Sequence, residues 1–249
     1  MPRPDISNWR AAYECLQHLA QERGVRGSIY DLLVEYEDAN YLSWTLAALT
    51  PWEQLPDEEP PKAGKLPLPL ATSASREGIK ATNKMCDVIT AAHRHRPSML
   101  ELKRLVDSKD ERMSERDRFG VAIQNWEARG GHWRSQVLYS ILVDVMERAD
   151  DISTTPDTQT FGDTARDKVL QEWGRFLDHL KTLDVMFAPG IARIIDGHQL
   201  AGALGVKPGK WMAPALDIVM AWQLRNPGKT DPAAAIEEVR ARSKELGIR

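Results

Sequence analysis

The stretch over residues 196–227 contains two segments with helical periodicity, separated by residues that end helices. Gly205, Pro208 and Gly209 end the first segment and turn the chain. A second helix is then expected over residues 211–224, because apolar residues recur there at helical spacing. The stretch therefore predicts two short helices joined by a tight elbow, and the rest of the chain must provide a fold that accommodates them.

The elbow between these two helices is basic, since Lys207 and Lys210 flank the turn. A turn of Gly, Pro and Lys exposes backbone N–H groups at the start of the second helix, with two ammonium groups beside them. This combination suits a phosphate group. Gly-Pro elbows are also common as plain connections between helices, so a purely structural turn is the alternative interpretation.

Helical periodicity continues through the rest of the chain, and no segment has the pattern of a convincing strand. Ser7, Ser28 and Ser75 are expected to cap helices, because a serine hydroxyl can accept a hydrogen bond from an amide of the first turn. We predict an all-α protein with about eight to ten helices and no sheet. Besides the pair above, helices are expected over residues 8–23, 28–49, 76–94, 97–106, 114–130, 133–148, 163–187 and 231–246.

Changes in composition predict a body and a tail. Residues 1–149 are expected to form the helical body and residues 163–249 the helical tail, with a polar linker rich in Asp and Thr over residues 150–162. The body contains a Pro-rich insertion over residues 50–75, which cannot be one helix because six prolines lie within it. The sequence thus predicts two helical parts and one long connection inside the first.

Charge and hydropathy limit the partners that this chain can have. The formal net charge is −3, so a nucleic-acid contact would have to use local basic patches. No apolar run approaches the roughly 18 residues of a membrane span, and the N-terminus lacks the apolar core of a secretory signal. We expect an intracellular protein without a membrane partner, and the cytoplasm, nucleus and mitochondrion all stay open. Cys15 and Cys86 are then expected to be buried thiols.

Two pairs of side chains resemble ligand-binding groups, but a structural role is favoured for each pair. His93 and His95 would point about 200° apart on a helix, so they cannot hold one ion together, and no metal site is expected. Trp126 and Trp133 flank a glycine turn, where packing in the core is favoured over stacking on bases.

A second basic cluster lies in the first half of the chain. Seven Lys or Arg residues and three Asp or Glu residues occupy positions 76–104. Arg76, Lys80 and Lys84 follow one another at intervals of four, which would place them on one face of a helix. This face is a candidate for phosphate contacts. A solvated basic face without a ligand is the alternative.

The elbow belongs to a longer pattern. Asp196-Gly197 and Leu200 precede Leu204-Gly205-Val206-Lys207-Pro208-Gly209-Lys210-Trp211, and Leu216-Asp217-Ile218-Val219-Met220-Ala221-Trp222-Gln223 follows. This pattern resembles the tail of class II tRNA nucleotidyltransferases, the CCA-adding enzymes, and most of all their fungal branch. The typical run there is G-x-x-[LI]-x-x-L-G-[LIV]-K-P-G-P-W, continuing close to L-D-x-V-M-x-W-Q. Lys210 departs from it, because the family usually has proline at this place.

The resemblance covers most of residues 46–224 and is strongest at 75–84 and 196–223. It implies that the chain binds tRNA at its elbow and acceptor stem while a head domain adds C, C and A to the 3′ end. Double-helical RNA would be recognised by its shape and its phosphates. The RNA-binding residues expected on this basis are Arg76, Lys80, Lys84, Lys207, Lys210, Arg134 and Arg193.

The catalytic head of that family has no counterpart in this sequence. Its paired Asp residues hold two metal ions for phosphoryl transfer, whereas this chain has no Asp-x-Asp. The family's Glu-Asp-x-x-Arg pattern finds only Glu37-Asp38, with Tyr41 in place of Arg. No catalytic residue is expected here, and Mg²⁺ with CTP or ATP would belong to a head outside this chain, such as a separate polypeptide.

Two other classes of function stay open at this point. The first is a helical interaction protein that kept the tail fold without RNA binding or catalysis. The second is an autonomous enzyme, for which no catalytic set is visible. RNA contacts through phosphates would weaken steeply as salt increases, and this dependence separates RNA binding from the interaction protein.

Overall fold

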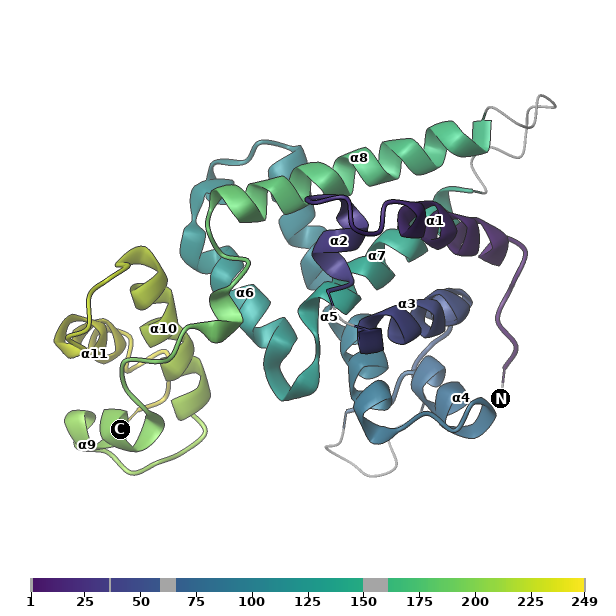
Figure 1. Cartoon of the computed structure of the whole chain (residues 1–249). Coiled ribbons are helices and arrows are strands. Elements are labelled where there is room, and N and C mark those ends of the chain that lie inside the picture. The colour runs from purple at the N-terminus through teal and green to yellow at the C-terminus, as the bar shows by residue number, and fades with distance from the viewer. Residues whose placement is uncertain (1, 36, 59–65, 150–160, 249) are drawn as a thin grey trace. The chain divides into compact units, whose positions relative to one another are not determined.

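The computed structural model describes residues 2–35, 37–58, 66–149 and 161–248 (Figure 1). These ranges contain eleven α-helices, a few short 3₁₀ helices and no strand. The prediction of an all-α fold is therefore confirmed. No helix within the same ranges is long and apolar enough to cross a membrane.

The chain forms two compact units, and each consists of two segments of the sequence. Unit 1 contains Met1–Lys109 and Trp126–Asp178, and unit 2 contains Asp110–Asn125 and His179–Arg249. The linker expected over residues 150–162 lies almost wholly outside the described residues. The division into a body over 1–149 and a tail over 163–249 stays a prediction.

Unit 1 surrounds one central helix, α7, which has the predicted bounds Trp133–Arg148. Thirteen of its residues are buried, so it is covered on every side, and it packs against α1, α2, α3 and α5 (Figure 1). The other elements of the unit are α1 Trp9–Gln21, α2 Ile29–Leu33, α3 Glu37–Leu49, η1 Thr50–Gln54, α4 Leu70–Gly78, α5 Asn83–Asp107, η3 Ala128–Gly130 and most of α8 Phe161–Thr182.

Unit 2 contains the predicted pair of short helices. Its elements are η2 Glu111–Ser114, most of α6 Arg116–Glu127, η5 Ala188–Gly190, α9 Gly197–Leu204, α10 Met212–Arg225 and α11 Ala233–Ala241. A small apolar core joins α9, α10 and α11 through Leu200, Val219, Trp222 and Val239. Elsewhere in the unit α6 lies very close to α10, since a methyl group at Gly120 would come within 2.6 Å of Leu224 Cδ1.

The single helix expected over residues 76–94 is wrong. α4 ends at Gly78, and Lys80 has a positive φ of 55°. α5 then starts after Thr82, whose hydroxyl accepts a hydrogen bond from the amide of Met85 at 3.3 Å. A glycine and a threonine cap within five residues favour a break, and this local signal outweighs the regular spacing of the basic residues.

Two further expected helix boundaries are wrong. The helix expected over residues 28–49 is divided into α2 and α3, and Val34, where α2 ends, has non-helical backbone angles. On a continuous helix Asp31 and Glu35 would lie four positions apart, and like charges at this spacing are destabilising. Pro97 was expected to start a helix but lies inside α5 with its ring exposed. Packing of the buried residues Met99 and Leu102 holds α5 continuous there.

The serine residues expected as caps differ in their roles. Ser28 caps α2 as predicted and accepts a hydrogen bond from the amide of Asp31 at 3.1 Å. Ser75 is instead buried within α4, where its hydroxyl donates to the carbonyl of Ala71 at 2.6 Å. Ser7 precedes α1, and its hydroxyl donates to Asp5 at 2.6 Å.

Both cysteines are buried and free, as predicted. Burial raises the pKa of the Cys15 thiol to about 12, so this side chain is packed in its neutral form. Trp126 and Trp133 are each 2% exposed, which confirms that they belong to the core.

Arg116, near the start of α6, binds the ends of two other helices within unit 2. Its guanidinium donates to the carbonyls of Leu183 at 2.8 Å and Asp184 at 2.9 Å, just beyond the end of α8. It also donates to the carbonyl of Leu224 at 2.8 Å, at the end of α10. Carbonyl groups at helix ends have no partner within the helix, so one side chain satisfies groups from two elements.

We predict that Arg116→Ala lowers the free energy of unfolding of unit 2 by about 2–3 kcal/mol, since hydrogen bonds to a charged group are lost and carbonyls lose their donors. Chemical denaturation followed by circular dichroism measures this change. The matched control is Arg118→Ala on the same helix, where an exposed ion pair with Glu115 contributes at most about 0.5–1 kcal/mol. Equal effects of the two substitutions would contradict this role of Arg116.

Candidate functional site

The predicted elbow in unit 2 is held at both ends by local hydrogen bonds. Gly205 ends α9 with a positive φ of 69°, and the amide of Val206 donates back to the carbonyl of Ala201 at 3.0 Å. At the other end, the indole N–H of Trp211 donates to the carbonyl of Lys207 at 3.0 Å. The chain between these two points therefore has a defined conformation although all four of its residues from 207 to 210 are exposed.

The start of α10 offers fewer backbone donors than the sequence suggested. The amide of Met212 donates to the carbonyl of Gly209 at 3.1 Å, and Pro214 in the first turn has no N–H. The ammonium groups of Lys207 and Lys210 have no hydrogen bond or ion pair within the part of the chain that the structure describes. An anion bound at the elbow would therefore contact mainly the lysine side chains and, to a lesser degree, backbone amides.

Arg193, expected to contact RNA, lies in the segment that precedes α9 and is exposed. The backbone on both sides of it is fixed to α10, because Gln223 accepts from the amide of Ile194 at 3.2 Å and donates to the carbonyl of Ala192 at 3.1 Å. Burial raises the pKa of Asp217, and the positive charge of Arg193 opposes this shift. The positive charge of Arg193 therefore already interacts with the side chain of Asp217 in the same unit.

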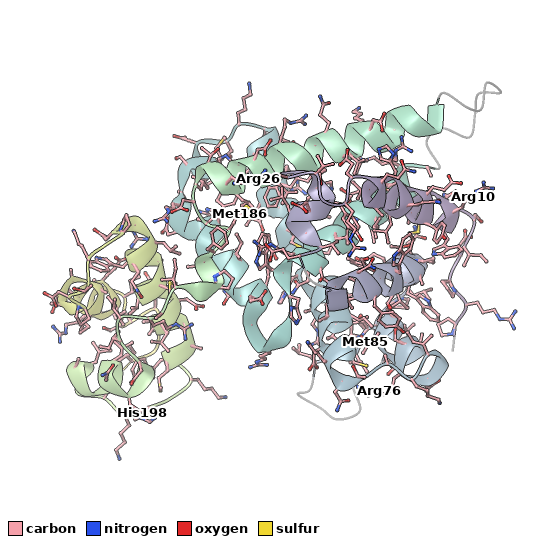
Figure 2. The ribbon with its side chains drawn as sticks, in the orientation of Figure 1. Arg10, Arg26, Arg76, Met85, Met186 and His198 are labelled. Atoms are coloured by element: carbon pink, nitrogen blue, oxygen red, sulfur yellow. The ribbon has the colours of Figure 1, made fainter. Side chains whose placement is uncertain are left out.

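The basic residues Arg76, Lys80 and Lys84 of unit 1 are all exposed, but they do not lie on one helix face. Arg76 is in the last turn of α4 (Figure 2), Lys80 is in the connection, and Lys84 is in the first turn of α5. The spacing of four residues therefore does not place them on one face, because the helix is interrupted between Gly78 and Asn83. All three cations still surround the same short connection, next to the exposed side chain of Ile79.

Arg134 is engaged in contacts within unit 1. Its guanidinium donates to the carbonyl of Leu32 at 2.9 Å, pairs with Glu35 at 3.1 Å and lies 4.7 Å from the ring centre of Trp133. Only 17% of the side chain is exposed. These contacts connect the start of α7 to the end of α2, and they favour a structural role for Arg134 over a contact with RNA.

His93 and His95 point to different partners, as their spacing predicts. The ring of His93 contacts Glu53 at 2.8 Å and Tyr139 at 2.9 Å, while His95 contacts Gln136 at 2.9 Å. Among the described residues, no group of three or more His, Cys, Asp or Glu side chains could hold a metal ion.

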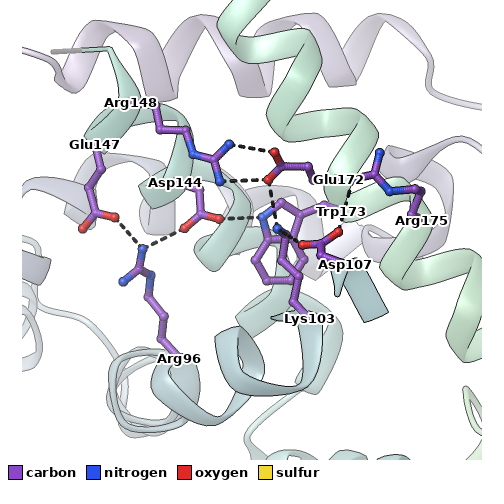
Figure 3. A network of polar contacts seen from close by, with 9 residues as sticks. All are labelled: Arg96, Lys103, Asp107, Asp144, Glu147, Arg148, Glu172, Trp173 and Arg175. Carbon is purple, nitrogen blue, oxygen red and sulfur yellow. Dashed lines mark hydrogen bonds and ion pairs between the residues drawn. The ribbon is translucent and has the colours of Figure 1, made fainter. Parts of the chain in front are cut away.

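A buried ionic network in unit 1 was not expected from the sequence (Figure 3). At its centre Arg96 of α5 donates to Asp144 at 2.8 Å and to Glu147 at 2.7 Å, both on α7. Arg96 is 8% exposed. Burial alone would lower its pKa, but the charges of Glu147, Glu53 and Asp144 raise it. The arginine is therefore charged inside the unit.

The network continues toward α8. Glu172 accepts two hydrogen bonds from Arg148, at 3.0 and 2.8 Å, and one from Lys103 at 3.0 Å. Asp144 accepts a further bond from the indole of Trp173 at 2.9 Å. Three helices that are distant in sequence are thus joined by charged hydrogen bonds, which are the stronger kind in proteins.

A hollow of about 430 Å³ lies against this network. We call it the charged hollow, and ten residues from α5, α7 and α8 line it: Arg96, Leu100, Lys103, Arg104, Asp107, Asp144, Glu147, Arg148, Glu172 and Arg175. Sequence reasoning missed it because, apart from the bond between Lys103 and Asp107, its bonds join residues 24 to 69 positions apart. One sequence signal was available, since Asp144 is the one charged residue in the run of residues 137–146 in α7.

Comparison with known proteins shows that this chain is similar to part of a longer protein. No protein-family model matches this chain, and no solved structure matches it. The chain is similar to a protein named nucleotidyltransferase lcsQ from Purpureocillium lilacinum, with 46% identity over 273 aligned residues. The alignment covers 99% of this chain and 45% of that protein. The chain is thus a homologue of a nucleotidyltransferase and spans less than half of its length.

We predict that Glu172 makes the free energy of unfolding of the protein depend on pH in the acidic range. The hydrogen bond from Arg148 holds the pKa of Glu172 at about 2, against 4.5 ordinarily, and burial opposes this shift. A lowered pKa stabilises the fold above the ordinary value, and this contribution is lost as the pH falls from about 4.5 toward 2. Glu172→Gln should therefore be less stable than the wild type at neutral pH and lose less stability in that window.

Urea denaturation at a series of pH values measures both effects. Glu101→Gln is the matched control for the loss of one glutamate, because Glu101 is an exposed residue of α5. Parallel pH profiles for the wild type and Glu172→Gln would contradict the assignment.

Proposed function

We propose that this chain is the tRNA-binding helical part of a CCA-adding nucleotidyltransferase. It would hold the tRNA while a head domain outside this chain adds C, C and A to the 3′ end. The observation that carries the proposal is the elbow over residues 207–210, where two lysines are exposed on a backbone fixed at both ends. The similarity to a nucleotidyltransferase of more than twice this length supports it.

The elbow is suited to the phosphates of an RNA backbone. Lys207 and Lys210 carry flexible ammonium groups that act as point charges, so they tolerate small differences in phosphate position. The backbone beneath them is held by Gly205 and Trp211, so the two charges start from fixed points. Such contacts position a duplex and carry no base sequence. This matches a protein part that holds many tRNAs in one orientation.

The chemical step would take place in a head domain outside this chain. This chain has no Asp-x-Asp pair, and two-metal phosphoryl transfer needs carboxylates that hold the ions. Mg²⁺ and the nucleotide would bind in the head, and this chain would contribute orientation of the RNA. Orientation alone can supply a large part of a rate enhancement, because it converts a bimolecular step into one between positioned groups.

We predict that Lys207→Glu and Lys210→Glu each weaken tRNA binding, and that the double variant weakens it by about tenfold or more at low salt. Each lost phosphate contact should also reduce the slope of log affinity against log salt by roughly one. Fluorescence anisotropy with labelled tRNA across a salt series measures both quantities.

The matched control is Lys244→Glu, an exposed lysine of the same unit and the same change in net charge. It should affect binding clearly less than either elbow variant. Unchanged tRNA affinity of the double variant, with a native circular dichroism spectrum, would contradict the proposal. Binding that is insensitive to salt would instead indicate an interaction protein that does not use phosphates.

A further inference from the structure

Three arginines from three different helices line the charged hollow of unit 1. Arg104 belongs to α5, Arg148 to α7 and Arg175 to α8. The side chains of Arg148 and Arg175 are 37% and 51% exposed, and Arg104 is exposed as well. Figure 3 shows Arg148 and Arg175 on either side of Glu172. Solvent therefore reaches guanidinium groups from all three helices around this hollow.

The carboxylates of the hollow are already paired. Asp107 accepts from Lys103 at 2.7 Å and from Arg175 at 3.2 Å. Glu172 accepts from Lys103 and Arg148, as described above. Asp144 and Glu147 share the guanidinium of Arg96 in the same way. Each of the four acidic side chains thus has a cationic donor.

The donors of the hollow, in contrast, are only partly used. Within the described part of the chain, Arg104 has no hydrogen bond or ion pair, and Arg175 uses one of its nitrogen atoms. The Nε atom of Arg96, whose side chain is nine-tenths buried, has no partner among the same residues. A guanidinium group has five N–H donors, so the site has spare donors and lacks acceptors.

The sum of charges points the same way. Five cationic side chains and four carboxylates line the hollow, which leaves one positive charge in excess. A cationic ligand would be repelled, and an apolar ligand would leave the spare donors unpaired at a cost. An anion with several acceptor oxygens satisfies both conditions. Guanidinium groups match the oxygens of a phosphate group in pairs.

We propose that the charged hollow is a binding site for a phosphate group, held by Arg104, Arg148 and Arg175. Its volume of about 430 Å³ falls within the range of small-ligand sites. The phosphate could belong to a free compound, such as pyrophosphate or a nucleotide, or to an RNA backbone. The proposal does not rest on tRNA binding, because the elbow residues belong to the other unit.

The test uses inorganic pyrophosphate and the full chain in isothermal titration calorimetry at low ionic strength. The variants are Arg104→Gln and Arg175→Gln, and the matched control is Arg26→Gln, an exposed arginine of unit 1 (Figure 2). Each hollow variant should weaken pyrophosphate binding by about fivefold or more. The control should change it by less than about twofold, because it alters net charge alone.

Folding does not obscure this test. Arg104 has no partner within the described residues, so Arg104→Gln should keep the circular dichroism spectrum and the melting temperature of the wild type. No binding of pyrophosphate by the folded wild type at millimolar concentration would overturn the proposal. So would binding that Arg104→Gln and Arg26→Gln weaken equally.

Competition then distinguishes the two sources of the phosphate. If a short RNA duplex displaces pyrophosphate, and Arg104→Gln weakens the binding of both, the hollow accepts backbone phosphates. If CTP or ATP displaces pyrophosphate but RNA does not, the hollow accepts a free compound. This test follows pyrophosphate binding through Arg104 and Arg175 of unit 1, which the tRNA-binding proposal does not use, so a failure of that proposal would not be mistaken for a failure of this one.

Discussion

The burial of one positive charge determines how unit 1 is built. Removing a guanidinium group from water costs several kcal/mol, and nearby carboxylates with good geometry must offset this cost. Arg96 obtains them from Asp144 and Glu147 on α7, with Glu53 of η1 a little farther away at 3.7 Å. Since Asp144 also accepts from Trp173 of α8, the arrangement of four elements depends on this one charge.

In unit 2 the groups that need partners are hydrogen-bond acceptors, whereas in unit 1 the group that needs partners is a donor. There the groups that need partners are carbonyl oxygens at the ends of α8 and α10, and Arg116 supplies the donors. Because α10 is fixed at its end by Arg116 and at its start by Trp211, the elbow before it is attached to a rigid helix. The position of Lys207 and Lys210 therefore depends on contacts that use neither lysine side chain, as is typical of exposed binding groups on a rigid scaffold.

Local chemistry explains which parts of the fold could be predicted. α7 was predicted with its observed bounds because its apolar run is long and uninterrupted by glycine or proline, and the end of α9 was predicted from Gly205. The continuity of α5 through Pro97 could not be predicted, since it depends on packing against α7. The ionic network was missed for the same reason, because no local pattern brings Lys103 to Glu172 across 69 positions.

At the candidate site, too, the local sequence predicts some features, while others depend on contacts between residues that are distant in the sequence. A sequence identifies cations, but it does not show which of them are already used within the fold. Arg134 and Lys207 looked alike as basic residues, yet Arg134 binds a carbonyl, a carboxylate and a tryptophan ring of its own unit. A chain with a net charge of −3 can bind phosphates only through cations that its own carboxylates leave over. The internal pairing of charges therefore decides which cations could bind an anion, and among the described residues the elbow and the charged hollow both keep spare donors.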